Sequence, residues 1–506
     1  MPPSESHAAA VERLGRGAFL ALVGSGLGRV VNFLGQVVLA RWLGPSMLGL
    51  YALGWGAFRL LTLPATLGIH NGIQRFGSIS RSRSGAGGAG LLRMALRLTL
   101  VVGSLAGLGL VVASRWLAAE VYADDRLLPI LVVFGLALPA AALLRVSAAA
   151  TRVSQDLRAS VVLEDFGQPF LFALLAVILL WRGVGVLGAA VAAGLSFVLV
   201  APPALVWARR WFPRVEPGSE IAETPLVDAA GLIRYSLPTA VAGTVGVTMT
   251  WLDRLLVGYY LPTEAVGWYQ VAAQASGAFA VVLSAFTAIF APMIAGLIER
   301  GETTRLEELF RIATKWGMLA VLPGGTLCLL FPAASLGAIF GPDYLPAALP
   351  LVILVLGQLV HAVTGTVGYL LMMSGHPKTW LALSLAALVA DVGLNMVLIP
   401  RYGLGGAAAA TTLSVGLLFV TGLILVRRRI AIWPYDRRLT GVAATAALVV
   451  AGSSLIHAVE GLSPGATVAT VVAVSCLLTA VGWRLFCFRP EDAVLLGLVR
   501  RLGKRE

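Results

Sequence analysis

The chain has 506 residues, of which 58% are hydrophobic and only 12% are charged, and its formal net charge is +13 at pH 7. Soluble domains carry about 25% charged residues, and no soluble core could hide this much apolar surface. The composition therefore excludes a soluble protein and predicts an integral membrane protein. The positive charge is interpreted as basic cytoplasmic loops, so nucleic acid is not an expected partner.

About 14 apolar spans follow one another along the chain, each long enough to cross a bilayer. They must be helices, because a backbone exposed to lipid has to satisfy its own hydrogen bonds. With the N-terminus inside, about 29 of the 38 Lys and Arg residues lie on or beside the cytoplasmic face. We therefore expect a multi-pass protein of the cytoplasmic (inner) membrane with both termini in the cytoplasm. The expected spans lie near 18–40, 49–71, 95–117, 127–149, 161–181, 184–208, 237–260, 267–296, 314–338, 347–373, 379–399, 404–426, 440–458 and 465–487.

Three sequence blocks recur at an offset of about 217 to 221 residues, which indicates an internal repeat. Because each repeat holds an even number of spans, the copies should share one orientation and form two six-helix lobes related by an axis along the membrane normal, as in transporters. The matching blocks are Pro45 to Tyr51 with Pro262 to Tyr269, 127–143 with 348–363, and 185–196 with 403–414. The expected division is a cytoplasmic tail (1–17), an N-lobe (18–208), a cytoplasmic linker (209–236), a C-lobe (237–426), two extra spans with a basic loop before them (427–487) and an amphipathic cytoplasmic tail (488–506).

The segments between the spans are short. Gly44 and Pro45 predict a tight turn at the outer face between the first two spans. Ser78–Gly90 is expected to be a flexible basic loop, and Leu226–Tyr235 a short amphipathic helix along the membrane interface. The longest outer loop, Trp116–Arg126, is too short to hold a catalytic domain. The chain also shows no zinc-protease, phosphate-loop or aspartate-rich metal motif, so no enzyme, catalytic residue, metal or cofactor is expected.

Three motifs carry a family resemblance: LARWLGPSMLGLYALG after the first span, DRLLVGYYLPTEAVGWY before the eighth, and a set beginning at Phe340 that reads FGPDYLPAALPLVILVLGQ, MMSGHPKT and NMVLIPRYGLGGAA. They resemble the oligosaccharide flippases of polysaccharide biosynthesis, including O-antigen-type translocases, in the multidrug/oligosaccharidyl-lipid/polysaccharide exporter superfamily. The resemblance covers about residues 18–426. It implies a central cavity, alternating access and a polyprenyl-diphosphate-linked oligosaccharide as cargo, with membrane lipids and glycan-assembly proteins as further partners.

Arginines inside the spans are the candidate ligands for such a cargo, because guanidinium groups bind phosphates in pairs of hydrogen bonds and stay charged. An arginine within a membrane span usually faces a cavity or a partner. Arg29, Arg59 and Arg254 are expected to bind the diphosphate, although Asp253 could instead neutralise Arg254. Arg145 lies near a cytoplasmic end and could simply extend to the interface. Secondary candidates for the cavity are Asn32, Gln36, Arg145, Asp253, Gln270 and Gln274.

A second polar group could couple transport to a gradient of H⁺ or Na⁺. Asp391 and Asn395 are four residues apart on one helical face, and His361 is a titratable group in a neighbouring span. A helix–helix hydrogen bond and a packing histidine are the alternatives. Glu164 and Asp165, near a cytoplasmic end, are expected only to pair with Arg152 or Arg158.

Other functions stay open at this point. They are a cation-coupled multidrug exporter of the same superfamily, a flippase for a lipid-linked peptidoglycan precursor, and a membrane glycan polymerase or ligase. The exporter would favour a cavity lined by carboxylates, and the polymerase would need a large outer loop, which this chain lacks.

Overall fold

The computed structural model of the chain describes residues 7–82, 87–154, 160–212, 227–436, 438–458 and 463–488. In these ranges the regular structure is helical throughout, and eleven helices are long and apolar enough to cross a membrane. The prediction of an all-α integral membrane protein is confirmed, whereas the count of 14 helices stays a prediction. The chain divides into two compact units, Met1–Gly267 and Trp268–Glu506.

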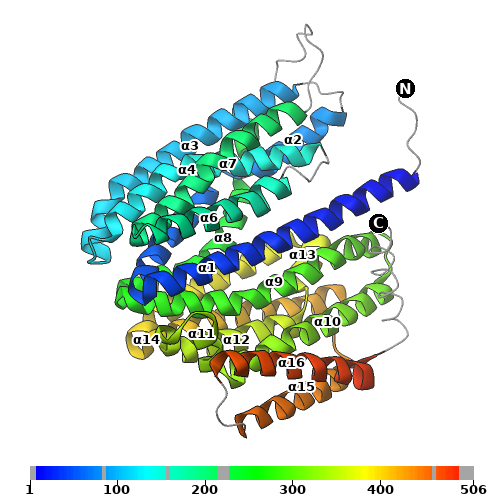
Figure 1. Cartoon of the computed structure of the whole chain (residues 1–506). Coiled ribbons are helices and arrows are strands. Elements are labelled where there is room, and N and C mark those ends of the chain that lie inside the picture. The colour runs from blue at the N-terminus through cyan, green and yellow to red at the C-terminus, as the bar shows by residue number, and fades with distance from the viewer. Residues whose placement is uncertain are drawn as a thin grey trace. The chain divides into compact units, whose positions relative to one another are not determined.

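The first unit is built around α4, which packs against α3 and α7 while α1 crosses α4, α6 and α8 (Figure 1). Its small residues allow this close approach: Gly103 and Gly107 of α3 face Pro139 and Gly135 of α4. The elements of this unit are α1 (His7–Ala65), α2 (Ile69–Ser82), α3 (Gly88–Trp116), η1 (Leu117–Val121), α4 (Leu127–Val153), η2 (Val161–Gly167), α6 (Gln168–Trp181), α7 (Gly185–Trp211) and α8 (Ala229–Tyr260).

The helix α1 contains the turn that the sequence predicts. Gly44 has φ 70° and ψ 172°, so the helical path stops there and restarts at Pro45. A glycine tolerates this positive φ without a Cβ clash, and a proline is well suited to the first position of the new helix. The turn at Gly44 and Pro45 is therefore confirmed, and α1 consists of two helical segments rather than one.

The second unit is organised around α14, which packs against α12 and α13 and breaks at Gly403 (φ 57°), between the two spans expected at 379–399 and 404–426. The last two long helices, α15 and α16, pack together and against α10. The elements of this unit are α9 (Thr263–Glu299), whose first turn lies in the first unit, α10 (Thr303–Leu330), α11 (Pro332–Ile339), η4 (Pro342–Ala347), α12 (Ala348–Thr364), α13 (Val367–Met373), α14 (Pro377–Ile430), α15 (Arg438–Ser454), η5 (Leu455–Ala458), α16 (Pro464–Gly482) and η6 (Trp483–Cys487).

The structure differs from the sequence-based expectation in three connecting segments. The expected loop Ser78–Gly90 is helical as far as Ser82, where α2 ends, and again from Gly88, where α3 begins. The expected loop Trp116–Arg126 contains the π-helix η1 from Leu117 to Val121. The expected interface helix ending at Tyr235 is not separate: from Ala229 onward it forms the first turns of α8, capped by the Asp228 carboxylate, which accepts a hydrogen bond from the Gly231 N–H at 2.9 Å. The N-terminal tail up to residue 6, the middle of the linker and the C-terminal tail lie outside the described residues.

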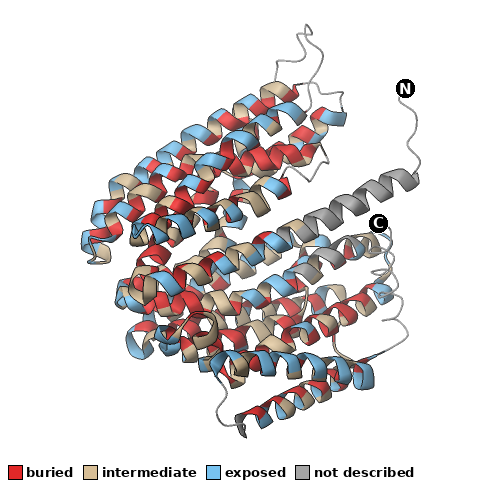
Figure 2. Cartoon of the chain, viewed as in Figure 1, coloured by how far each residue is buried: buried red, intermediate tan, exposed pale blue. Residues whose placement is uncertain are grey.

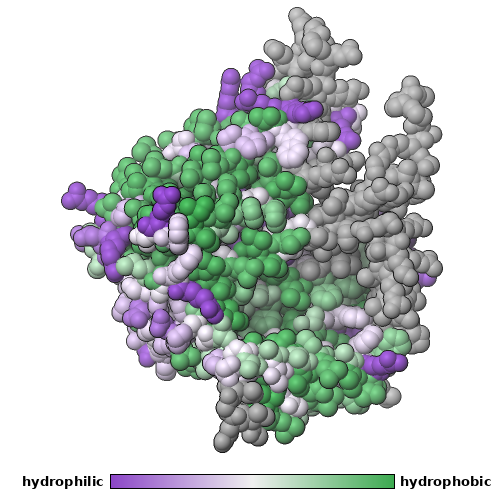
Figure 3. Space-filling model, in the orientation of Figure 1, coloured by the Kyte–Doolittle hydropathy of each residue, from purple (hydrophilic) through white to green (hydrophobic). Residues whose placement is uncertain are grey.

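The surface of the helices matches a lipid environment. Within each unit the buried residues lie where helices face one another (Figure 2). Large apolar side chains such as Val112, Trp181 and Val389 are exposed. On the face shown in Figure 3, hydrophobic residues cover the middle of α3, α4 and α7, and hydrophilic residues gather near their ends. Such a band of exposed apolar residues is the surface that a membrane protein presents to lipid tails.

Candidate functional site

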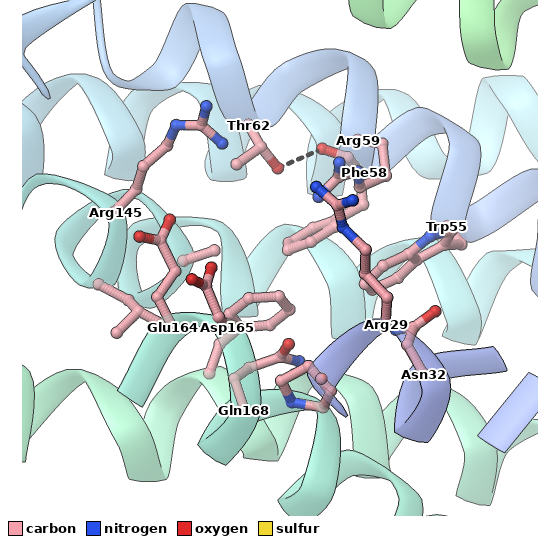
Figure 4. Close-up of a pocket in the computed structure, with 15 residues that line it drawn as sticks. Arg29, Asn32, Trp55, Phe58, Arg59, Thr62, Arg145, Glu164, Asp165 and Gln168 are labelled. Atoms are coloured by element: carbon pink, nitrogen blue, oxygen red, sulfur yellow. Dashed lines mark hydrogen bonds between the residues drawn. The ribbon is translucent and has the colours of Figure 1, made fainter. Parts of the chain in front are cut away.

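A cavity of about 350 Å³ lies inside the first unit, between α1, α4, η2, α6 and α7 (Figure 4). Its walls combine charged, amide and aromatic side chains at a point surrounded by apolar helices. The lining residues are Gly28, Arg29, Asn32, Trp55, Phe58, Arg59, Thr62, Ala141, Leu144, Arg145, Glu164, Asp165, Gln168, Pro169 and Phe197.

Two of the arginines come from the two segments of α1. Arg29 and Arg59 are 30 residues apart, and in one straight helix they would be separated by about 45 Å. Because the helical path is broken at Gly44, the two segments bring both side chains to the same cavity. The third guanidinium, that of Arg145, enters from α4. The sequence predicted that Arg29 and Arg59 share a site, and the structure places Arg145 with them.

The carboxylates of the cavity come from η2, a stretch of π-helix that carries Glu164 and Asp165. Segments of π-helix insert an extra residue into a turn and often occur at functional sites. The segment lies very close to α1, since a Cβ added to Gly28 would be 1.7 Å from the backbone oxygen of Asp165. Gly28 is therefore the residue that permits η2 and its two carboxylates to approach the arginines of α1.

One carboxylate is held by an arginine outside the lining. The Arg152 guanidinium donates to the Glu164 carboxylate at 2.6 Å, which confirms the pairing that the sequence suggested. The other suggested partner, Arg158, lies outside the described residues. Arg145 has a buried Nε with no hydrogen-bond partner among the residues that the structure describes. In Figure 4 the Glu164 and Asp165 carboxylates point into the same space as the guanidinium group of Arg145.

Aromatic rings form one wall of the cavity. Trp55 stacks on Phe58 with ring centroids 5.3 Å apart and on Phe197 at 6.3 Å. The Arg59 guanidinium carbon lies 6.0 Å from the Trp55 ring centre, at the outer limit of a cation–π contact. The Gln168 amide donates to the Ser196 hydroxyl at 2.9 Å. In Figure 4 Arg29 and Arg59 lie beside Trp55 and Phe58, so a ligand there would meet guanidinium groups and aromatic rings together.

Arg254, predicted as a third phosphate ligand, does not line this cavity. It is buried in α8, where its guanidinium donates to the Asp253 carboxylate at 3.0 Å and its Cζ lies 4.5 Å from the Trp251 ring centre. It also donates to the backbone oxygen of Thr250. The alternative stated for Arg254, neutralisation by Asp253, is therefore what the structure shows. Gln36 is buried in α1 and is likewise not part of the lining.

The remaining candidates belong to the second unit. Gln270 and Gln274 are in α9, and Gln270 is buried. Asp391 and Asn395 are buried in α14, and the Asn395 amide donates to the Asp391 backbone oxygen at 2.9 Å, so this hydrogen bond stays within one helix. His361 of α12 stacks on Phe419 with ring centroids 4.0 Å apart, as a packing histidine does.

Among the lining residues that were given no role in substrate binding from sequence alone are Glu164, Asp165 and Gln168. A signal was present, because Glu164 and Gln168 are four residues apart in an otherwise apolar span and polar residues in such a span usually face a cavity. Their position near a cytoplasmic end favoured a simple ion pair instead. Only the packing of η2 on α1 shows that they reach the cavity.

The fold is that of membrane transporters. The chain is similar to the lipid II flippase MurJ in an inward closed conformation, with a TM-score of 0.71 and 13% identity over 92% of this chain and 98% of that one. It is also similar to a multidrug resistance MATE family transporter of the MOP superfamily in an inward-facing conformation, with a TM-score of 0.62 and 18% identity over 81% of this chain and 98% of that one.

The sequence matches the family described as polysaccharide biosynthesis protein over residues 38–349, and the chain belongs to this family. A probable low-salt glycan biosynthesis flippase, Agl15 of Haloferax volcanii, is 24% identical over 408 residues, 79% of this chain and 81% of that protein. A probable flippase, AglR of the same organism, is 28% identical over 178 residues, 34% of this chain and 36% of that protein. The resemblance deduced from the sequence motifs is confirmed.

Proposed function

We propose that this protein is a flippase that moves a polyprenyl-diphosphate-linked oligosaccharide from the cytoplasmic to the outer leaflet of the cytoplasmic membrane, for the synthesis of a surface polysaccharide. The family and the curated relatives named as flippases support this function. The observation that carries it is the cavity of the first unit, which Arg29, Arg59 and Arg145 line together.

The three guanidinium groups suit a diphosphate. An arginine in a membrane span costs free energy unless it faces water or a partner, so three of them around one cavity favour an anionic ligand. A diphosphate offers several oxygens, each able to accept charge-assisted hydrogen bonds, and arginine stays protonated throughout the transport cycle. The Asn32 amide adds a donor without adding charge.

The aromatic wall suits the parts of the cargo that flank the diphosphate. Trp55, Phe58 and Phe197 form an aromatic cluster in the lining, beside Arg29 and Arg59. Isoprenoid units and the apolar faces of sugar rings both bury favourably against such rings. A purely ionic site would bind any small anion equally, whereas this combination favours an anion with apolar neighbours.

Transport by alternating access, without chemical change of the cargo, is part of the proposal. Structures similar to this chain include MATE family transporters in both inward-facing and outward-facing conformations. The cytoplasmic location of both termini and a possible H⁺ or Na⁺ coupling through Asp391, Asn395 or His361 remain proposals, as does Arg254 as a further phosphate ligand.

A cation-coupled multidrug exporter is the second candidate, because Glu164 and Asp165 line the cavity and MATE transporters share the fold. A cationic drug would require these carboxylates to be free of arginines. Here Glu164 is paired with Arg152, and three arginines share the cavity. This arrangement favours an anionic cargo.

The test measures transport of a fluorescent short-chain polyprenyl-diphosphate oligosaccharide in proteoliposomes. A membrane-impermeant reductant quenches only the molecules in the outer leaflet, so the quenched fraction reports transport. The variants Arg29→Ala, Arg59→Ala and Arg145→Ala should each lose most of the transport. Arg182→Ala, an exposed arginine after α6 that is outside the cavity lining, is the matched control and should keep it. Full activity of the three cavity variants, or efflux of cationic dyes that needs Glu164, would contradict the proposal.

A further inference from the structure

Two arginines of α4 compete for one carboxylate. Arg145 and Arg152 are seven residues apart, so they lie on the same side of the helix, about 10.5 Å apart along its axis. Glu164 of η2 lies opposite this side and interacts electrostatically with both guanidinium groups. In the described residues Arg152 donates one hydrogen bond to this carboxylate, and none joins the carboxylate to Arg145.

The structure shows which arginine holds it. The Arg152 Nη2 lies 2.6 Å from the Glu164 carboxylate, and the two side chains are 36% and 22% exposed. Arg152 is not among the lining residues of the cavity, whereas Arg145 is. The Arg145 Nε is buried and has no hydrogen-bond partner in the part of the chain that the structure describes. The pairing of Glu164 with Arg152 thus leaves the cavity arginine available.

We propose that Arg152 is a positioning residue for the binding of the cargo: by holding Glu164, it prevents this carboxylate from pairing with Arg145 and keeps Arg145 available for a phosphate oxygen of the diphosphate. The inference rests on the proposed function and assigns a role to a residue outside the cavity. Glu164 then acts as an internal competitor of the anionic cargo, because carboxylate and phosphate bind the same guanidinium fork.

The charges around the site agree with this role. Glu164 also interacts electrostatically with Arg59, and Asp165 lies next to it on η2. A Glu164 carboxylate released from Arg152 would therefore be attracted toward the cavity, where the other arginines already concentrate positive charge. Without Arg152, the negative charge of Glu164 would offset part of the positive charge of the arginines that bind the diphosphate. Binding would weaken although none of these arginines has been removed.

Binding of a short-chain polyprenyl diphosphate to the purified full chain in nanodiscs, measured by titration calorimetry, tests the inference. Arg152→Ala should weaken binding about tenfold, within the range of coupling between adjacent charges. The double variant Arg152→Ala with Glu164→Gln should return to within about threefold of the wild type, since the competing charge is gone. Arg152→Lys should bind nearly as well as the wild type, and Glu164→Gln alone should bind no more weakly.

Rescue by Glu164→Gln separates this role from a structural one. If Arg152 only stabilised the fold, removing the charge of Glu164 would not restore the affinity that Arg152→Ala loses. Wild-type affinity in Arg152→Ala, or a double variant as weak as the single one, would overturn the inference while leaving the proposed function intact. No binding of the diphosphate by the wild type would overturn the proposed function itself. If Arg152→Ala does not fold, the same comparison is made with Arg152→Gln. Its affinity for the diphosphate, with and without Glu164→Gln, then tests the inference.

Discussion

Gly49 and Gly267 face each other where the second segment of α1 meets the beginning of α9. A Cβ on Gly49 would lie 1.8 Å from the backbone oxygen of Thr263, and a Cβ on Gly267 would lie 2.0 Å from the backbone oxygen of Pro45. Each glycine follows a proline by a few residues, Pro45 or Pro262, in the two motifs that the sequence analysis matched. Within the first unit the two motifs therefore contact each other in a reciprocal way.

Replacing either glycine should destabilise the protein. Gly49→Val and Gly267→Val place atoms where backbone oxygens already lie, and overpacking of this kind costs about 1–3 kcal/mol. Thermal unfolding in detergent, followed by tryptophan fluorescence, should show a lower midpoint for both. Gly109→Ala in α3, where nothing lies within 4 Å of the added atom, is the control and should unfold like the wild type.

Gly28→Ala should weaken binding of a polyprenyl diphosphate, because the added methyl group would push η2 away from α1 and move Glu164 and Asp165 relative to the arginines. Binding to the purified variant is measured by titration calorimetry. The matched control is Gly26→Ala in the same helix, where the methyl group meets no atom within 4 Å. Equal binding by the two variants would show that the approach of η2 does not shape the site.

Arg254→Ala should reduce stability, because it removes the guanidinium group that donates to the buried Asp253 carboxylate. Removing one member of a buried pair typically costs about 3–5 kcal/mol. The double variant Arg254→Ala with Asp253→Asn should recover much of this loss in thermal unfolding. If the folded double variant also binds polyprenyl diphosphate more weakly than the wild type, Arg254 is a phosphate ligand in addition, as the sequence predicts.

The segment between α3 and α4 gives a prediction on pH. Arg126 donates to the Asp124 carboxylate from Nε at 2.9 Å and Nη2 at 2.7 Å, and these hydrogen bonds hold the pKa of Asp124 below its usual range. A depressed pKa in the folded state stabilises it above the pKa of the unfolded chain, about 3.9, and this contribution disappears as the pH falls through the folded value.

Asp124→Asn should therefore lower stability slightly and by a constant amount from pH 5 to pH 8, by at most about 1 kcal/mol. The difference from the wild type should vanish under more acidic conditions, as unfolding midpoints across the pH range would show. Asp125→Asn, at an exposed neighbouring carboxylate, should behave like the wild type throughout. A constant difference that persists down to pH 2 would exclude the ion pair as its cause.

Much of the fold could be read from residue types alone. Runs of apolar residues predict the helices because a membrane leaves the backbone no other partner than itself. The break at Gly44 was predictable for a local reason as well, since glycine followed by proline ends one helix and begins the next. The extension of α2 to Ser82 was not predictable, because a polar sequence outside the membrane is compatible with both helix and loop.

The candidate site was predictable in part. Arg29, Arg59 and Asn32 were expected to face a cavity because charge and amide groups in apolar spans are costly elsewhere, and they do line one. The same principle could not decide which of Arg145 and Arg254 faces the cavity. One lies open to the cavity and the other is buried against Asp253 and Trp251, and this difference depends on how the helices rotate about their own axes.

The sequence by itself determined the class of the protein, the approximate helices and the family, and it predicted the chemical type of the residues that line the candidate site. Tertiary structure decided which of those residues meet. The close approach at Gly28 brings the carboxylates of η2 to the arginines, and Arg152 rather than Arg145 holds Glu164. Hydropathy and residue spacing describe a helix as a whole. An ion pair depends on the distance between two side chains to within about an ångström, and only the packing of several helices fixes that distance.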